Sequence, residues 1–123
     1  MMLYLNFDDA LQLVRDLGVG PVVDPGSLDS ALHRPRSVIY GEEAYGGIAA
    51  KAAVLLESIV RNHPLADGNK RLGWLSVVVF CGLNGIEVEA PDDVVYELVI
   101  AVANGRLGWR EIAGQLEPML HPV

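Results

Sequence analysis

Residues 69–83 read Asn-Lys-Arg-Leu-Gly-Trp-Leu-Ser-Val-Val-Val-Phe-Cys-Gly-Leu, and this stretch decides the fold class of the chain. From Leu72 onward it is apolar on almost every side of a helical wheel, as expected of a helix buried by its neighbours. Its three valines would also suit a buried strand, but such strands usually span only about 4–8 residues. The length therefore favours a helix. We expect an all-α fold of about six helices around this central hydrophobic one.

A second long helix is predicted from Ala44 onward, because apolar residues recur there three and four positions apart. Pro64 ends it, since the residue before a proline is steered out of the helical region. Glu57 and Arg61 form an i,i+4 pair on its polar side. The apolar face consists of Ala44, Ile48, Ala49, Ala52, Leu55, Leu56, Ile59 and Val60.

Shorter helices are predicted on the N-terminal side. Asn6 caps the first of them, which stops at Gly18. Residues 24–26, Asp-Pro-Gly, are interpreted as a turn, and Ser27 then caps a second helix that ends before Pro35.

The remaining segments alternate between loops and helices. A loop is predicted from Arg34 to Gly46, and a loop of that length is usually functional or disordered. Residues 84–85, Asn-Gly, end the central helix, and residues 86–89 form a short extended link. Residues 91–93, Pro-Asp-Asp, open a helix with acids in its first turn, where the helix dipole favours them. The last helix is predicted to present Trp109, Ile112, Ala113, Leu116, Met119 and Leu120 on one face.

Composition limits the classes of protein to consider. A chain of 123 residues fits one domain, here residues 1–123, and its hydrophobic fraction of 51% is enough to build a core. Acidic residues outnumber basic ones by 16 to 9, so the formal charge is −7. This balance argues against direct, sequence-independent binding of nucleic acid, which needs a basic surface.

Nothing in the sequence predicts export or a membrane span. The first residues lack the basic segment of a signal peptide, and the apolar run at 72–83 is far shorter than the roughly 20 residues of a span. Cys81 is the one cysteine and has no partner for an internal disulfide, so it is predicted to be a core residue. We therefore expect a soluble cytoplasmic protein with no membrane partner.

The segment His-Pro-Leu-Ala-Asp-Gly-Asn-Lys-Arg at 63–71 breaks a local rule of helix design. Lys70 and Arg71 stand in the first turn of the central helix, where two cations are unfavourable by roughly a few tenths of a kcal/mol each. Free N–H groups at Gly68, Asn69 and Lys70 add unpaired donors. Such a site favours an anion, and phosphate is the usual one. Gly68 would let the backbone approach that ligand closely.

Two more residues of this segment carry useful chemistry. His63 can take a proton from an attacking hydroxyl at neutral pH. Asp67 is a hard oxygen ligand that suits Mg²⁺ on a triphosphate. Lys70 and Arg71 can neutralise charge on a phosphoryl group during its transfer.

Each of these residues also has a purely structural interpretation. His63 suits the C-terminus of a helix, and Asp67 is a good helix N-cap. Lys70 and Arg71 are compatible with a solvated face, and Gly68 with an ordinary turn. Composition and spacing leave both interpretations open.

The nonapeptide closely resembles the signature of the Fic/Doc superfamily, His-x-Phe-x-Asp/Asn-Gly/Ala-Asn-Lys/Gly-Arg. It resembles the Doc branch, because Lys70 stands where Fic adenylyltransferases have glycine and Trp74 stands where they have a second arginine. The resemblance implies the Fido fold over nearly the whole chain. It extends to Asp24, Pro25, Gly26, Ala31, Leu32 and Arg34.

The resemblance also implies a role for each matching residue. His63 matches the family's catalytic base and Asp67 its metal-binding acid. Residues 68–71 match the turn that cradles the nucleotide phosphates, with Lys70 and Arg71 acting in the reaction. Arg61 stands where Doc-like proteins also carry an arginine near the phosphates.

Doc proteins transfer the terminal phosphoryl group of ATP to a threonine of elongation factor Tu, which arrests protein synthesis. The resemblance implies the same activity here, with ATP and Mg²⁺ as cofactors. The inhibitory string Ser/Thr-x-x-x-Glu-Gly/Asn of many Fic enzymes does not occur in the chain. A cognate antitoxin is therefore expected, with a tail that folds on binding a groove of the toxin. The loop from Arg34 to Gly46 is the candidate for holding the target segment, and a passive surface loop is the alternative interpretation.

Two departures from the family pattern occur: the first is an apolar replacement that should still anchor the loop to the core, and the second concerns the strength of nucleotide binding. Leu65 replaces the usual phenylalanine, and residues 72–75, Leu-Gly-Trp-Leu, replace the usual Thr-Ala stretch and offer no polar side chain.

Two rival functions remain. One is a Fic-type AMP transferase, against which Lys70 argues because its bulk crowds the arrangement that exposes the α-phosphate. The other is a non-catalytic module that binds nucleotide or antitoxin, against which the retained His63 and Asp67 argue.

Overall fold

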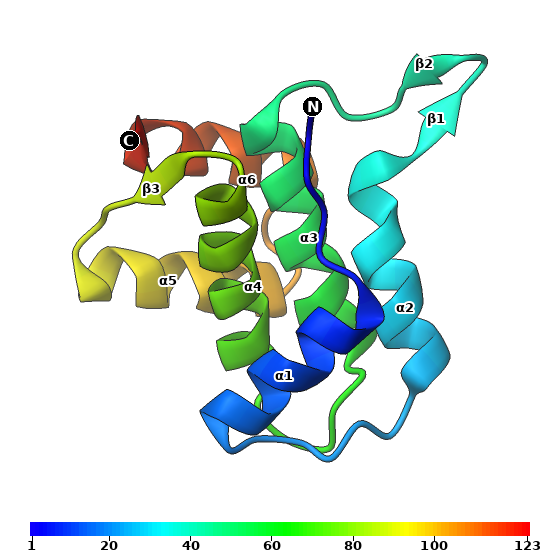
Figure 1. Cartoon of the computed structure of the whole chain (residues 1–123). Coiled ribbons are helices and arrows are strands. Elements are labelled where there is room, and N and C mark those ends of the chain that lie inside the picture. The colour runs from blue at the N-terminus through cyan, green and yellow to red at the C-terminus, as the bar shows by residue number, and fades with distance from the viewer.

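The computed structural model describes all residues from 1 to 123 and confirms the all-α fold class (Figure 1). It contains six α-helices, two short 3-10 turns and two small two-stranded sheets. The helices are α1 (Phe7–Leu17), α2 (Pro25–His33), α3 (Ile48–Asn62), α4 (Asn69–Leu83), α5 (Asp92–Ala103) and α6 (Trp109–Leu116). None of them is long and apolar enough to cross a bilayer.

A hydrophobic helix does lie at the centre, but it is α3 rather than α4. Helix α3 packs against α2, α4, α5 and α6, and eleven of its 15 residues are buried. Its small alanines at 49, 52 and 53 are buried and lie on one face, where they allow close packing of a neighbouring element. Helix α4 runs antiparallel beside it, with seven of 15 residues buried. Its half-buried Trp74 and Leu75 line a surface groove instead of the core.

The segment at 34–46 is more ordered than the predicted loop. A 3-10 turn, η1 (Arg34–Arg36), leads into an antiparallel hairpin of β1 (Val38–Ile39) and β2 (Glu42–Glu43). Helix α3 then begins at Ile48 rather than at Ala44, because Gly47 adopts φ +85° and interrupts the helical path.

Lys51 fixes this segment to α3. Its side chain is only 1% exposed, and its Nζ donates to the carbonyls of Pro35 at 3.2 Å and Tyr45 at 2.7 Å. The same ammonium lies 3.4 Å from a carboxylate oxygen of Glu43 in the hairpin. A buried lysine requires such partners, so the hairpin base and α3 form one unit.

Helix caps explain the N-terminal elements. Asn6 and Asp9 form a capping box at the start of α1, and Gly18 closes that helix with φ +67°, as predicted. The cap of α2 is Asp24, whose Oδ1 accepts from the Ser27 N–H at 3.0 Å, so the prediction that Ser27 is the cap was wrong. Residues 24–26 are thus the start of α2 and not a separate turn.

The C-terminal region departs from the prediction after Leu116. Pro118 lies in a 3-10 turn, η2 (Glu117–Met119), so Met119 and Leu120 fall outside α6. The chain then forms β4 (Leu120–Pro122), which pairs with β3 (Ile86–Val88), the segment predicted to be an isolated extended link.

Candidate active site

The segment that joins α3 to α4, residues 63–68, is here called the motif turn. His63 ends α3 in the left-handed region at φ 52°, ψ 55°, and Pro64 prevents the helix from continuing, as predicted. The motif turn pairs with residues 20–24, which lie antiparallel to it around a bridge between Val22 and Leu65. The backbone hydrogen bonds join Gly20 N–H to Asp67, Ala66 N–H to Pro21, and Val23 and Asp24 N–H to Pro64, at 2.9–3.1 Å.

Asn69 holds the motif turn from the inside. Its buried side chain accepts from the Leu65 N–H at 2.9 Å and donates back to the Leu65 carbonyl at 3.0 Å. The same amide nitrogen lies 3.3 Å from Nδ1 of His63. The Asn69 side chain therefore shapes the turn, and only its backbone N–H is available to a ligand.

Gly68 is required by the packing of the motif turn. Its φ of +93° is unfavourable for residues with a side chain, and a Cβ at this position would lie 2.4 Å from Cβ of Val19. The missing side chain of Gly68 therefore makes room for Val19.

The start of α4 presents a cluster of unpaired donors. The N–H groups of residues 68–71 have no acceptor within the chain, because the first helical bond runs from Leu72 N–H to the Gly68 carbonyl at 2.9 Å. Lys70 is exposed, and the Arg71 side chain is 61% exposed with a single acid near it. Four free donors and two cations at a helix N-terminus form a site for a phosphate-sized anion.

His63 and Asp67 border this cluster, and both face solvent. The Asp67 carboxylate is 84% exposed and lies 3.8 Å from Arg71. It does not cap α4, since the N-cap is Gly68 and no side chain bonds there, so the alternative role of Asp67 as a cap is excluded. The motif turn thus brings His63, Asp67, Lys70 and Arg71 to one end of α4, as predicted.

Comparison with known proteins agrees with this arrangement. A family model described as Fic/DOC family matches residues 3–81. The chain belongs to the Fic/Doc family. It is also 42% identical over 93 residues to a curated protein named Toxin Doc from Mycolicibacterium smegmatis, which covers 74% of this chain and 72% of that protein. This similarity supports the Doc branch, which Lys70 predicted.

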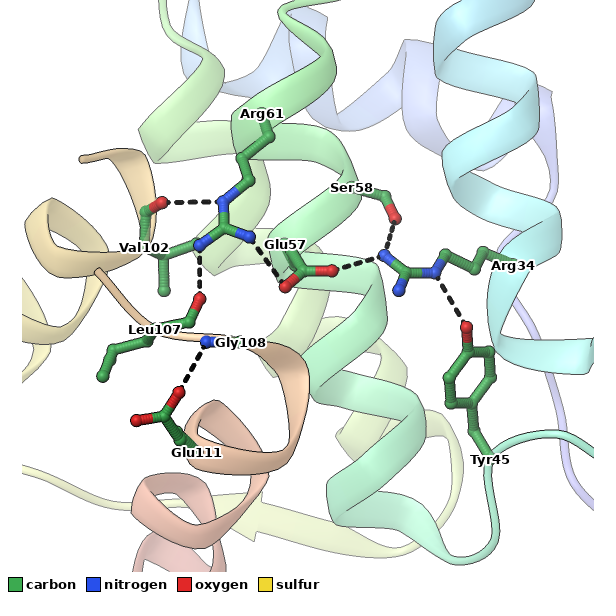
Figure 2. A network of polar contacts seen from close by, with 9 residues as sticks. All are labelled: Arg34, Tyr45, Glu57, Ser58, Arg61, Val102, Leu107, Gly108 and Glu111. Carbon is green, nitrogen blue, oxygen red and sulfur yellow. Dashed lines mark hydrogen bonds and ion pairs between the residues drawn. The ribbon is translucent and has the colours of Figure 1, made fainter. Parts of the chain in front are cut away.

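Arg61 does not reach the motif turn of this Fic/Doc protein. Its Nε donates to the Val102 carbonyl at 3.0 Å, one terminal nitrogen pairs with Glu57 at 2.9 Å, and the other donates to the Leu107 carbonyl. Figure 2 shows the guanidinium directed at the end of α5 and the loop after it. All of its nitrogens have a partner, so in this structure Arg61 ties α3 to α5 and contacts no residue of the phosphate cluster.

The hairpin at 38–43 lies far from the motif turn. It precedes the first residue of α3, whereas His63 follows the last one, and 15 helical residues span about 22 Å. Figure 1 shows the hairpin and the motif turn at opposite ends of α3. The segment that pairs with the motif turn is residues 20–24, whereas the tip of the hairpin in the 34–46 segment lies at the other end of α3.

An apolar groove begins beside the two cations. It has a volume of about 460 Å³ and lies between α1, α4 and α5. Lys70, Arg71 and Asp92 are its polar lining residues, while Trp74 and Tyr96 contribute aromatic walls. Sequence reasoning missed this groove, because it depends on the relative placement of three helices. Its trace in the sequence is that residues 72–83 are apolar on almost every side of the helix, including the side that the structure leaves half-buried.

Proposed function

We propose that this Fic/Doc protein is a toxin kinase, which transfers the terminal phosphoryl group of ATP to a threonine hydroxyl of elongation factor Tu and so arrests growth. One observation carries the proposal. Four free N–H groups, Lys70 and Arg71 converge at the start of α4, beside an exposed imidazole and an exposed carboxylate. Transfer of a phosphoryl group needs little more from a protein than positioning, charge neutralisation and a base.

In this mechanism the phosphate chain of ATP lies across the N-terminus of α4. The N–H groups of residues 68–71 and the cations of Lys70 and Arg71 hold the transferred group and stabilise the charge that develops on it. The N–H groups are already in place, because the motif turn is fixed by residues 20–24 and by Asn69.

His63 takes the proton of the acceptor hydroxyl. The Asn69 amide is oriented by both backbone groups of Leu65, so its second amino hydrogen points to Nδ1 of His63. A neutral imidazole that accepts there carries its proton on Nε2. For Nε2 to act as the base, His63 must release this 3.3 Å contact and move its proton to Nδ1, a change that binding of the hydroxyl would favour.

The donor set fits Mg²⁺ bound to a nucleotide. No group of three or more His, Cys, Asp or Glu side chains in the chain is arranged to hold a metal, so there is no all-protein cage. Asp67 offers a solvent-exposed carboxylate, and Mg²⁺ is usually held by one or two carboxylates together with substrate phosphates. Bound there, Mg²⁺ would neutralise phosphate charge.

A Fic-type AMP transferase is the enzymatic rival. Lys70 stands at the position of the Fic glycine, and its side chain occupies the rim of the site where the α-phosphate would have to be exposed. Trp74, in place of the second Fic arginine, faces the apolar groove and removes one phosphate ligand. Both residues favour phosphoryl transfer over adenylyl transfer.

A cognate antitoxin is the expected partner, and the cytoplasm is where both would meet the translation factor. The apolar groove is our candidate for the antitoxin tail, because a helix with an apolar face would bury Trp74 and Tyr96 there and bring its acidic residues to Lys70 and Arg71. The fully non-catalytic alternative, a module that only binds nucleotide or antitoxin, is less consistent with the exposed His63 and Asp67.

Intact-mass spectrometry of elongation factor Tu after incubation with this protein, ATP and Mg²⁺ tests the proposal. We expect a phosphoryl-sized mass gain that vanishes for His63→Ala and persists for His121→Ala, a change at an exposed histidine remote from the motif turn. An adenylyl-sized gain would establish the Fic reaction instead. No gain with ATP still bound would refute elongation factor Tu as the target.

A further inference from the structure

A second cavity, of different character, lies between α2, η1 and α3. It has a volume of about 420 Å³, and none of its lining residues is hydrophobic. We call it the Arg34 pocket, and it is lined by Ser30, His33, Arg34, Ser37, Ser58 and Asn62. Neither the family comparison nor the proposed mechanism assigns it a role.

Arg34 is held rigidly in this pocket but is not fully paired. Its Nε donates to the hydroxyl of Tyr45 at 3.1 Å, and one terminal nitrogen donates to Glu57 at 2.7 Å and to Ser58 at 2.9 Å (Figure 2). The second terminal nitrogen makes no hydrogen bond in the chain, and the side chain remains 30% exposed. Two N–H donors therefore stand in a fixed orientation with no acceptor.

The surroundings of Arg34 carry an excess of positive charge. Glu57 is shared: one oxygen pairs with Arg34 and the other with Arg61, so two guanidinium groups face one carboxylate. Partial burial lowers the pKa of Arg34, but its hydrogen bonds to Glu57 and Tyr45 outweigh burial and raise the pKa above the ordinary value. The group stays charged, in a protein whose net charge is −7.

The rest of the pocket wall supplies further donors. The hydroxyls of Ser30 and Ser37 make no hydrogen bond within the chain. Nδ1 of His33 lies 2.9 Å from the Asp29 carbonyl and 3.6 Å from the Asp29 carboxylate, the one acidic group near that side of the pocket. Asp29 does not line the cavity. A fixed cation with free fork donors and two free hydroxyls matches the chemistry of a carboxylate or phosphate.

We propose that the Arg34 pocket is an oxyanion subsite that binds an acidic side chain of the protein substrate. This proposal rests on the proposed kinase function. Asn62, in the pocket wall, directly precedes His63, so the pocket lies within a few residues of extended chain from the acceptor hydroxyl. It would select threonines that have Asp or Glu nearby in the sequence.

The test separates the pocket from the kinase reaction by measuring binding directly. The resonance of the Arg34 Nε–H is followed by NMR in the full chain during titration with acetate, with inorganic phosphate, and with threonine peptides that carry Glu or Gln two to four residues from the threonine. We expect saturable shifts with both small anions, and about tenfold tighter binding of at least one Glu peptide than of its Gln counterpart.

Matched variants test whether the binding of anions and Glu peptides depends on the Arg34 pocket. Arg34→Gln should abolish the preference for Glu while Glu57 keeps Arg61 as its partner, and Ser37→Ala, which leaves the network of Figure 2 intact, should weaken the binding followed at Arg34 severalfold. Arg106→Gln, at an exposed arginine outside the pocket, should change nothing.

The absence of any saturable shift with acetate and phosphate would overturn the subsite. Shifts with the small anions but equal binding of Glu and Gln peptides would overturn the substrate side chain as the source, and would leave a pocket for a free oxyanion. Because these measurements need no turnover, failure of phosphoryl transfer to elongation factor Tu would refute the proposed function without deciding the pocket.

Discussion

Replacing Lys51 by methionine should destabilise the protein and loosen the hairpin without altering the motif turn. The change removes two charge-assisted hydrogen bonds, to the carbonyls of Pro35 and Tyr45, and leaves both carbonyls without that donor. Each such bond contributes about 1.5–3 kcal/mol, while removal of a buried ammonium returns part of that through its desolvation cost. The expected net loss is about 2 kcal/mol in the free energy of unfolding, measured by urea denaturation with an unchanged m-value.

Amide hydrogen exchange shows where the loss falls. Protection should drop at residues 38–45, which Lys51 fixes to α3, and persist at residues 63–69, about 22 Å away along the helix. Glu43→Gln is the matched control, because it removes only the exposed ion-pair partner and should cost no more than about 0.5 kcal/mol. Equal loss of protection at both ends of α3, or a Lys51→Met variant as stable as the parent, would refute this account of the hairpin.

Further predictions concern Gly68, Cys81 and Asp67. Gly68→Ala should lower stability by about 2 kcal/mol through its positive φ and its contact with Val19, and Val19→Ala in the same chain should restore part of the loss in a urea titration. Burial raises the pKa of the Cys81 thiol to about 11, so a maleimide should label it in the folded protein far more slowly than in urea at pH 8. Because that pKa is raised from 9.0, the contribution of Cys81 to stability is complete below pH 9 and declines as the pH rises through 11, which unfolding curves at several pH values can check. Asp67→Asn should leave the fold unchanged, since the side chain is exposed, but should weaken Mg²⁺-dependent binding of ATP by tenfold or so in calorimetry; unchanged affinity would exclude it as a metal ligand.

Local signals in the sequence predicted much of the helical framework. Asn6, Gly18 and Pro64 mark helix ends by their own chemistry, and the structure places helix ends at or beside them. The nonapeptide likewise predicted the cluster at the start of α4, because a turn of six residues between two helices cannot carry its groups far apart. These features depend on residues that are close in the chain.

The features that were missed depend on distant residues. Residues 20–24 bond to the motif turn across forty or more positions, and Arg61 finds its carbonyl partners at Val102 and Leu107. The family resemblance placed Arg61 near the phosphates, two positions before His63. On a helix, however, positions two apart point in different directions, and Arg61 follows the α5 side of α3. Lys51 was overlooked for the same reason, since its partners are backbone carbonyls that no residue type reveals.

The pattern of satisfied and unsatisfied groups in the motif turn bears on how such a toxin is controlled. The Pro64 and Asp67 carbonyls and the Ala66 N–H are paired with the segment at 20–24, and both backbone groups of Leu65 are paired with Asn69, whereas the N–H groups of residues 68–71 are left free. The turn therefore loses its conformational entropy when the protein folds and not when phosphate binds. The anion site exists before any ligand arrives. A site of that kind cannot be switched off by a small shift in an order–disorder balance. Under the proposed function it would be covered or neutralised from outside, and the apolar groove that starts at Lys70 and Arg71 is our candidate surface for the antitoxin segment that does so.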